Sequence, residues 1–149
     1  MVYKAYKGLN IMPLYITERV HDYETMYNPA AVFVYFDSVK GDSTSAEALK
    51  IKRLDKDSRI AILYRKNMSS HGAWTEEEFK DEGAAYMNKG FDAIREYLIK
   101  NRLVIFPIRS FSVIKASTEE WVIDTFNKSY IEIVNTNPEH KDLFDYYAI

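Results

Sequence analysis

The stretch covering residues 30–38 constrains the fold more than any other part of this chain, because its apolar residues follow one another without alternation. A strand with one face in water alternates apolar and polar residues, whereas a strand covered on both faces does not. Pro29 stands before the run, and Asp37 and Ser38 end it. We therefore expect the central strand of a parallel sheet that lies between two layers of helices.

Two further short apolar runs, at residues 59–64 and 103–106, predict strands beside the first. A capping box at Thr75 and Glu78 and a longer helix over residues 81–101 lie between these two runs. The apolar residues of that helix recur at spacings of three and four and form one stripe, which consists of Ala84, Met87, Phe91, Ile94 and Leu98. The pattern predicts an α/β fold, a three-layer sandwich with a mixed, mostly parallel sheet flanked by helices, as in Rossmann-like proteins.

The 149 residues are most simply divided as one domain. We expect residues 1–29 to form an N-terminal arm or an edge strand, and residues 30–134 to form the α/β core. Asn137 and Pro138 resemble the start of a helix, so we predict a short C-terminal helix within residues 135–149. The periodicity of residues 130–134 fits a helix and a strand equally well.

Composition narrows the possible chemistry. The chain contains no cysteine, which excludes disulfides, thiolate metal sites and a cysteine nucleophile. The formal net charge of −2 gives no general reason to bind nucleic acid, and the longest apolar runs are too short to cross a membrane. We expect a cytoplasmic protein without a metal or cofactor. Its twelve tyrosines and eight phenylalanines are enough to form an aromatic contact surface for a partner.

Polar residues follow each predicted strand. Because open parallel sheets bind ligands at the carboxyl ends of their strands, these residues are the candidate site. Asp37 could orient a ribose hydroxyl or act as a general base, and Arg65 or Arg109 could meet a phosphate. Strand ends and helix caps explain the same residues without a ligand, with Asp42 or Ser43 capping a short helix from about residue 44. The candidate ligand-binding residues are Asp37, Ser38, Ser43, Thr44, Arg65, Arg109, Ser110 and Ser112, the last three in a segment, 108–115, that we interpret as a loop.

The order of these motifs resembles a family of small phage and bacterial α/β proteins that are distantly like macro domains. The first core strand of that family reads V-F-V-F-G-D-N, and residues 32–38 here read V-F-V-Y-F-D-S. The turn at residues 40–46, the helix start at 74–79 and the strand at 104–107 also match by order and spacing. The resemblance covers about residues 30–130 and implies a macro-domain-like fold that binds a nucleotide or an ADP-ribose-type ligand.

This chain departs from the family where the family has glycines. Phe36 stands at the first of them, Thr44 and Ser45 replace a glycine pair, and Ser110 and Ser112 stand in the second loop. Glycine lets backbone N–H groups approach a phosphate because it has no Cβ, and these side chains fill that space.

We therefore expect a non-enzymatic binding protein on a degenerate nucleotide-binding scaffold. In one form of this hypothesis, the chain is a phage accessory factor that engages or inhibits a host protein in the host cytoplasm. In another form, the partner is a second copy of the chain. The alternative is a macro-like domain that binds or processes a nucleotide or ADP-ribose-type ligand, with Asp37 as its catalytic residue. A nucleic-acid role ranks third, because Asp55 and Asp57 interrupt the basic segment at residues 50–59.

Overall fold

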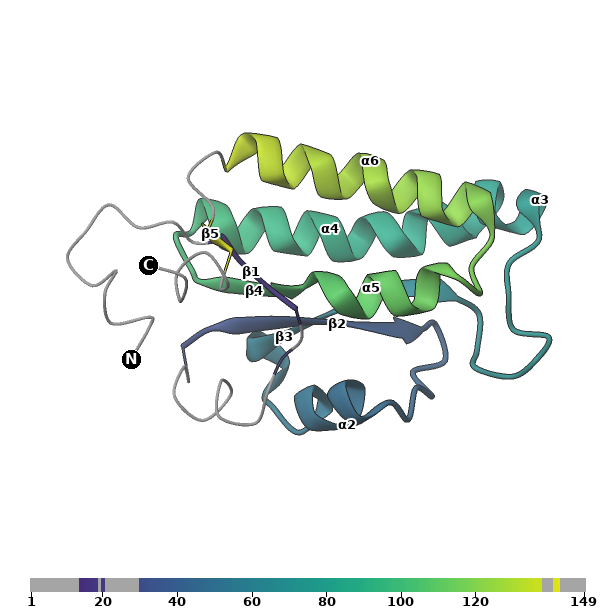
Figure 1. Cartoon of the computed structure of the whole chain (residues 1–149), viewed down its shortest axis with the longest axis horizontal. Coiled ribbons are helices and arrows are strands. Elements are labelled where there is room, and N and C mark those ends of the chain that lie inside the picture. Colours follow the sequence, from purple (N-terminus) through teal and green to yellow (C-terminus); the bar gives the residue numbers. More distant parts are fainter. Residues whose placement is uncertain (1–13, 19, 21–29, 138–140, 143–149) are drawn as a thin grey trace.

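The computed structural model describes residues 14–18, 20, 30–137 and 141–142. Its strands form one sheet in the order β3-β2-β4-β1-β5, and each of the four pairings between described strands is parallel (Figure 1). The strands are β1 (Leu14–Thr17), β2 (Val32–Ser38), β3 (Arg59–Arg65), β4 (Val104–Pro107) and β5 (Lys141–Asp142).

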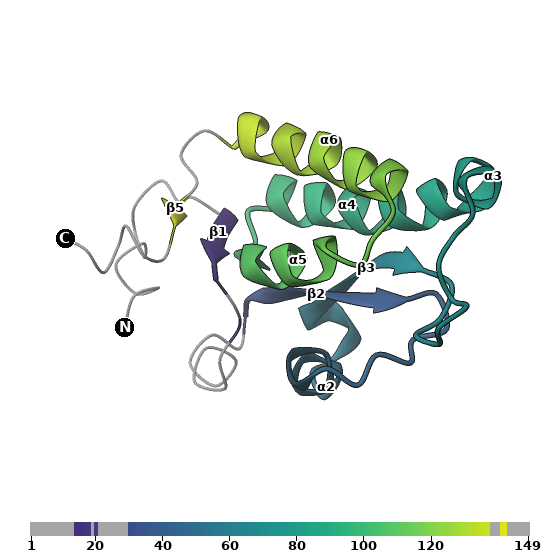
Figure 2. The ribbon, with the colours of Figure 1, turned by 45° about the vertical axis from the view of Figure 1, so that its right-hand side comes forward.

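Helices cover both faces of this sheet (Figures 1 and 2). One face carries α2 (Ala46–Lys52), and the other carries α4 (Ala84–Ile99), α5 (Ile108–Lys115) and α6 (Glu120–Thr136). The remaining helical segments are η2 (Lys56–Ser58), α3 (Glu76–Glu78) and η3 (Phe79–Gly83). The three-layer α/β sandwich with a parallel sheet is therefore confirmed.

Strand β2 lies inside the sheet, between β3 and β4, and all seven of its residues are buried. Val34 and Phe36 pack with the α4, α5 and α6 layer, whereas Phe33 and Tyr35 pack with α2. The unbroken apolar run thus supplies two faces of core at once, as the sequence predicted.

The long helical segment begins at Glu76 rather than near residue 81. Its start is the predicted capping box, in which the Glu78 N–H donates to Thr75 Oγ1 at 3.2 Å and the Thr75 N–H donates to Glu78 Oε1 at 3.0 Å. The π-helical turn η3 joins this start to α4. Gly90 lets α4 lie directly against β3, because a Cβ at this position would stand 2.7 Å from the Ala61 carbonyl oxygen. The chain then enters β4, which completes the predicted βαβ unit.

Three predictions between the strands need correction or completion. Residues 108–115 are helix α5 and not a loop, because Ile108, Phe111 and Ile114 place one apolar side against the core. Helix α2 begins at Ala46, and its N-cap is Ser45 rather than Asp42 or Ser43. The ambiguous residues 130–134 belong to α6, which continues to Thr136.

The C-terminal helix predicted within residues 135–149 is wrong at Lys141 and Asp142, which form β5 beside β1. Pairing with a buried strand there replaces the local helical preference. Residues 138–140 and 143–149 of that predicted helix lie outside the described residues, as do 1–13 and 21–29 of the predicted arm. Strand β1 itself lies between β4 and β5 rather than at the edge of the sheet. No helix in the described part of the chain has the length and apolar character needed to span a membrane.

Candidate functional site

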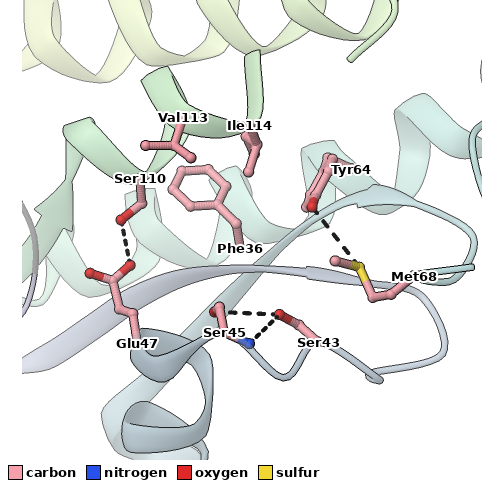
Figure 3. Close-up of a pocket in the computed structure, with 9 residues that line it drawn as sticks. All are labelled: Phe36, Ser43, Ser45, Glu47, Tyr64, Met68, Ser110, Val113 and Ile114. Carbon is pink, nitrogen blue, oxygen red and sulfur yellow. Dashed lines mark hydrogen bonds between the residues drawn. The ribbon is translucent and has the colours of Figure 1, made fainter. Parts of the chain in front are cut away.

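A pocket of about 240 Å³ opens at the carboxyl ends of β2 and β3, between the start of α2 and helix α5 (Figure 3). This is the edge of a parallel sheet where ligands ordinarily bind. The described residues that line it are Phe36, Ser43, Ser45, Glu47, Tyr64, Met68, Ser110, Val113 and Ile114.

The wall of the pocket is aromatic and fixed. The Phe36 ring, only 7% exposed, lies between the core and the pocket. Its centroid is 6.0 Å from those of Phe106 and Phe111 and 5.8 Å from that of Phe126. Because these rings pack against one another, Phe36 cannot leave the wall without opening the core.

The rim of the pocket is apolar and reaches solvent. Val113 on α5 is 69% exposed, and Met68 in the loop after β3 is 38% exposed. Tyr64 stands beside Met68, and its hydroxyl lies 3.9 Å from the Met68 sulfur. Burial raises the pKa of the Tyr64 hydroxyl, with a smaller lowering effect from Arg65 and a still smaller raising effect from Asp37. Tyr64 therefore stays neutral at physiological pH, as a tyrosine with a raised pKa must.

The polar side of the pocket centres on Glu47, in the first turn of α2. The Ser110 hydroxyl donates to Glu47 Oε1 at 2.6 Å, and the backbone N–H of Val20 donates to Glu47 Oε2 at 2.8 Å. Glu47 thus connects α2, α5 and the segment after β1. Sequence reasoning missed this residue, because an acidic residue in the first turn of a helix is already explained by the helix dipole.

Ser43 and Ser45 complete the polar side. The Ser45 hydroxyl accepts a hydrogen bond from the Ala48 N–H at 3.1 Å and so caps α2. The Ser43 and Ser45 hydroxyl oxygens are 3.4 Å apart. The pocket therefore places several hydroxyl groups beside one carboxylate, opposite an aromatic wall.

Asp37, the predicted catalytic residue, is not among the residues that line the pocket. It is 1% exposed, and its Oδ1 accepts hydrogen bonds from the N–H groups of Ser38 at 2.7 Å and Ser43 at 2.9 Å. Its Oδ2 lies 3.0 Å from Lys52 Nζ. Lys52 also donates to the carbonyl oxygens of Gly41 and Ser43, at 2.8 and 2.9 Å. The pair braces the turn over residues 38–43.

A second carboxylate, Asp42, joins this turn to the loop after β3. The Ser38 hydroxyl donates to Asp42, and the Met68 N–H lies 3.1 and 3.2 Å from its two oxygens. These bonds, that of Ser38 above all, lower the pKa of the Asp42 carboxyl. Asp42 thereby fixes the position of Met68 at the rim.

The cations predicted to meet a phosphate are bound elsewhere. Arg65 donates to the carbonyl oxygens of Asn67 and Ser69 at 2.6 and 2.7 Å. Arg109 pairs with Glu18 at 3.3 Å. Neither arginine is among the described residues that line the pocket.

Of the eight candidate residues, the structure brings Ser43 and Ser110 together at the pocket. Thr44 is exposed, and Ser38 lies within the braced turn. The Ser112 hydroxyl donates to the Ile108 carbonyl oxygen at 3.4 Å along α5. Within the described ranges, no group of three or more acidic or histidine side chains could hold a metal ion.

No protein-family model matches the chain, and neither does any curated protein or solved structure. We therefore infer function from the geometry of the pocket.

Proposed function

We propose that this chain is a non-enzymatic binding protein, and that its pocket receives an apolar group from a partner protein. One observation carries the proposal: the wall and rim of the pocket are apolar, whereas Asp37, the residue predicted for catalysis, is buried near the end of β2 and does not line the pocket. The resemblance to phage and bacterial proteins extends the proposal to an accessory factor that engages or inhibits a host protein in the host cytoplasm.

The environment of Asp37 argues against catalysis. A general base must lie within hydrogen-bond reach of the proton that it removes, directly or through one water. Asp37 is buried, and its carboxylate binds two backbone N–H groups and Lys52. Freeing it for chemistry would leave Lys52 without its partner and open the turn.

The rim argues for a macromolecular contact. Apolar side chains that reach solvent beside a pocket are typical of interaction sites, since partners bury them on binding. Val113 and Met68 come from α5 and from the loop after β3, and Asp42 holds the second of them in place. A partner side chain that enters the pocket would bury both residues.

The second candidate function is binding of a nucleotide or an ADP-ribose-type ligand. Its support is the position of the pocket at the carboxyl edge of a parallel sheet, together with the hydroxyls of Ser43, Ser45 and Ser110, which could bind ribose. The pocket residues offer no cation for a phosphate among the described side chains, and they include the carboxylate of Glu47. We therefore rank this function below protein binding.

Capture from a bacterial host lysate tests the proposal with a matched pair of variants. Val113→Asp places a charge at the rim, whereas Ile131→Asp places the same charge on α6, where Ile131 is 56% exposed. We expect a stoichiometric partner to bind the wild-type chain and Ile131→Asp, and to be lost with Val113→Asp.

A partner that binds both variants equally would place the interface elsewhere and contradict the role of the pocket. Thermal-shift measurements with ADP-ribose, NAD and cyclic nucleotides test the second candidate. We expect no shift at millimolar ligand, and a clear shift would reverse the ranking.

A further inference from the structure

We propose that the pocket selects a tyrosine side chain of the partner protein over a phenylalanine side chain of the same shape. The ring of that tyrosine lies against Phe36, and its hydroxyl meets the serine hydroxyls on the polar side of the pocket. This inference rests on the proposed binding function and specifies the side chain by which the partner docks.

The apolar side of the pocket fits one aromatic ring. A cavity of about 150 Å³ with apolar walls accommodates benzene in a well-studied engineered case. The pocket here measures about 240 Å³, and Phe36, Val113 and Ile114 stand together on its apolar side (Figure 3). A ring in this space can pack edge-to-face or offset on the Phe36 ring, as aromatic pairs prefer. The remaining volume accommodates a hydroxyl group beyond the ring.

Ser43 and Ser45 supply a hydrogen-bond donor that the described part of the chain leaves unused. Each hydroxyl carries one proton and has two acceptor positions. The Ser45 oxygen accepts from the Ala48 N–H at 3.1 Å, and the Ser43 oxygen accepts from the Ser45 N–H at 3.4 Å. The bond between the two hydroxyls, at 3.4 Å, uses one proton and leaves the other without an acceptor among the described residues. It is also longer than an ordinary hydroxyl bond of about 2.7–2.8 Å, so a closer acceptor in the pocket can replace it.

Ser110 supplies an acceptor on the same polar side. Its hydroxyl donates its proton to Glu47 Oε1 at 2.6 Å, and its oxygen accepts no hydrogen bond from the described residues. The pocket thus offers one donor and one acceptor, and a hydroxyl group matches both because it accepts and donates. Tyrosine carries a hydroxyl on an aromatic ring, and it is enriched among the residues that dominate binding at interfaces.

A phenylalanine side chain offers neither of these hydrogen bonds. Its ring would exclude water from the Ser43 and Ser45 hydroxyls, and a buried polar group without a partner lowers affinity. A pocket whose polar side took no part in binding would show the reverse order, because a phenol gives up its hydrogen bonds to water on entry. The relative affinity of two side chains that differ by one hydroxyl therefore tests the inference.

N-acetyl-tyrosine amide and N-acetyl-phenylalanine amide are the matched probes, because both are neutral and they differ only in that hydroxyl. Each is titrated into the ¹⁵N-labelled full chain while the amide signals of Met68, Ser110 and Val113 are followed. We expect the tyrosine derivative to bind about tenfold more tightly, since it forms two neutral hydrogen bonds that the phenylalanine derivative lacks.

Two double variants then identify the hydroxyls responsible. Ser43→Ala with Ser45→Gly removes both hydroxyls, and glycine at the N-cap keeps most of the capping preference of α2. The preference for the tyrosine derivative should fall to about threefold or less. Ser112→Ala with Ser70→Gly makes the same changes at exposed positions outside the pocket and should leave the preference intact. The probe pair on the wild-type chain decides the preference even if the first double variant does not fold.

The outcomes separate the two proposals. Equal binding of the two probes, or tighter binding of the phenylalanine derivative, would overturn the selection of tyrosine and leave an apolar binding pocket in place. A tenfold preference that survives in Ser43→Ala with Ser45→Gly would also overturn it. If neither probe shifts the three amide signals, the pocket does not receive an aromatic side chain, and the proposed function fails together with this inference.

Discussion

Truncation of Phe36 to alanine tests whether its side chain is part of the core or only the lining of a pocket. The ring contacts Phe106, Phe111 and Phe126 and is 7% exposed. Core replacements of phenylalanine by alanine cost about 3–5 kcal/mol. Because the new void would open into the pocket, where water can enter, we expect a loss near the lower limit, about 3 kcal/mol in the free energy of unfolding.

Equilibrium urea denaturation of the wild-type chain and of Phe36→Ala measures this loss, provided that the slope with denaturant is unchanged. Phe36→Leu is the control, because it keeps most of the volume and should cost less than about 1.5 kcal/mol. If Phe36→Ala costs less than about 1 kcal/mol, the Phe36 ring lines the pocket without stabilising the core, and the reasoning is refuted.

Three further predictions concern the braces around the site and the seat of α4. Asp37→Asn should lower the free energy of unfolding by about 2–3 kcal/mol in urea denaturation. This is below the usual cost of breaking a buried ion pair, because Lys52 is partly exposed. An unchanged denaturation midpoint would show that the Asp37–Lys52 pair does not stabilise the fold. Asp42 has a lowered pKa, so its contribution is fully present above the carboxyl pKa of the unfolded chain, about 3.9, and is lost as the pH falls through the lower pKa of the folded state. The wild-type chain should therefore lose more stability than Asp42→Asn over that acidic range, and parallel unfolding curves at several pH values would show whether it does. Gly90→Ala should cost about 1–3 kcal/mol, because its Cβ would stand 2.7 Å from the Ala61 carbonyl oxygen; a stabilised variant in thermal unfolding would refute this close contact.

The sequence was informative wherever a pattern was long or had a local physical cause. The unbroken run in β2, the capping box at Thr75 and the apolar stripe of α4 were all read correctly. Helix α5 was missed because it has only eight residues, Ser110 and Ser112 suggested a polar loop, and Pro107 suggested a stop. Strand β5 was missed because a two-residue strand depends on its neighbour β1 and has no periodicity of its own.

A pocket opens at the edge of the sheet where the candidate residues were expected, but the sequence did not predict the directions of their side chains. Asp37, near the end of β2, pairs with Lys52, which is fifteen positions later in the chain, and no local sequence pattern predicts that pairing. Ser43 and Ser110 were identified as strand-end residues, and both line the pocket. Glu47 joins them because α2 and α5 meet there, which is a tertiary contact rather than a motif.

The most direct test of the account is the affinity of the captured partner for three forms of the chain, measured by isothermal titration calorimetry. We predict that Val113→Asp weakens binding by about thirtyfold or more, corresponding to about 2 kcal/mol, the loss expected of an interface hot spot, while Ile131→Asp matches the wild-type chain. Equal affinities for Val113→Asp and the wild-type chain would show that the partner does not use this pocket, and would contradict the proposed function.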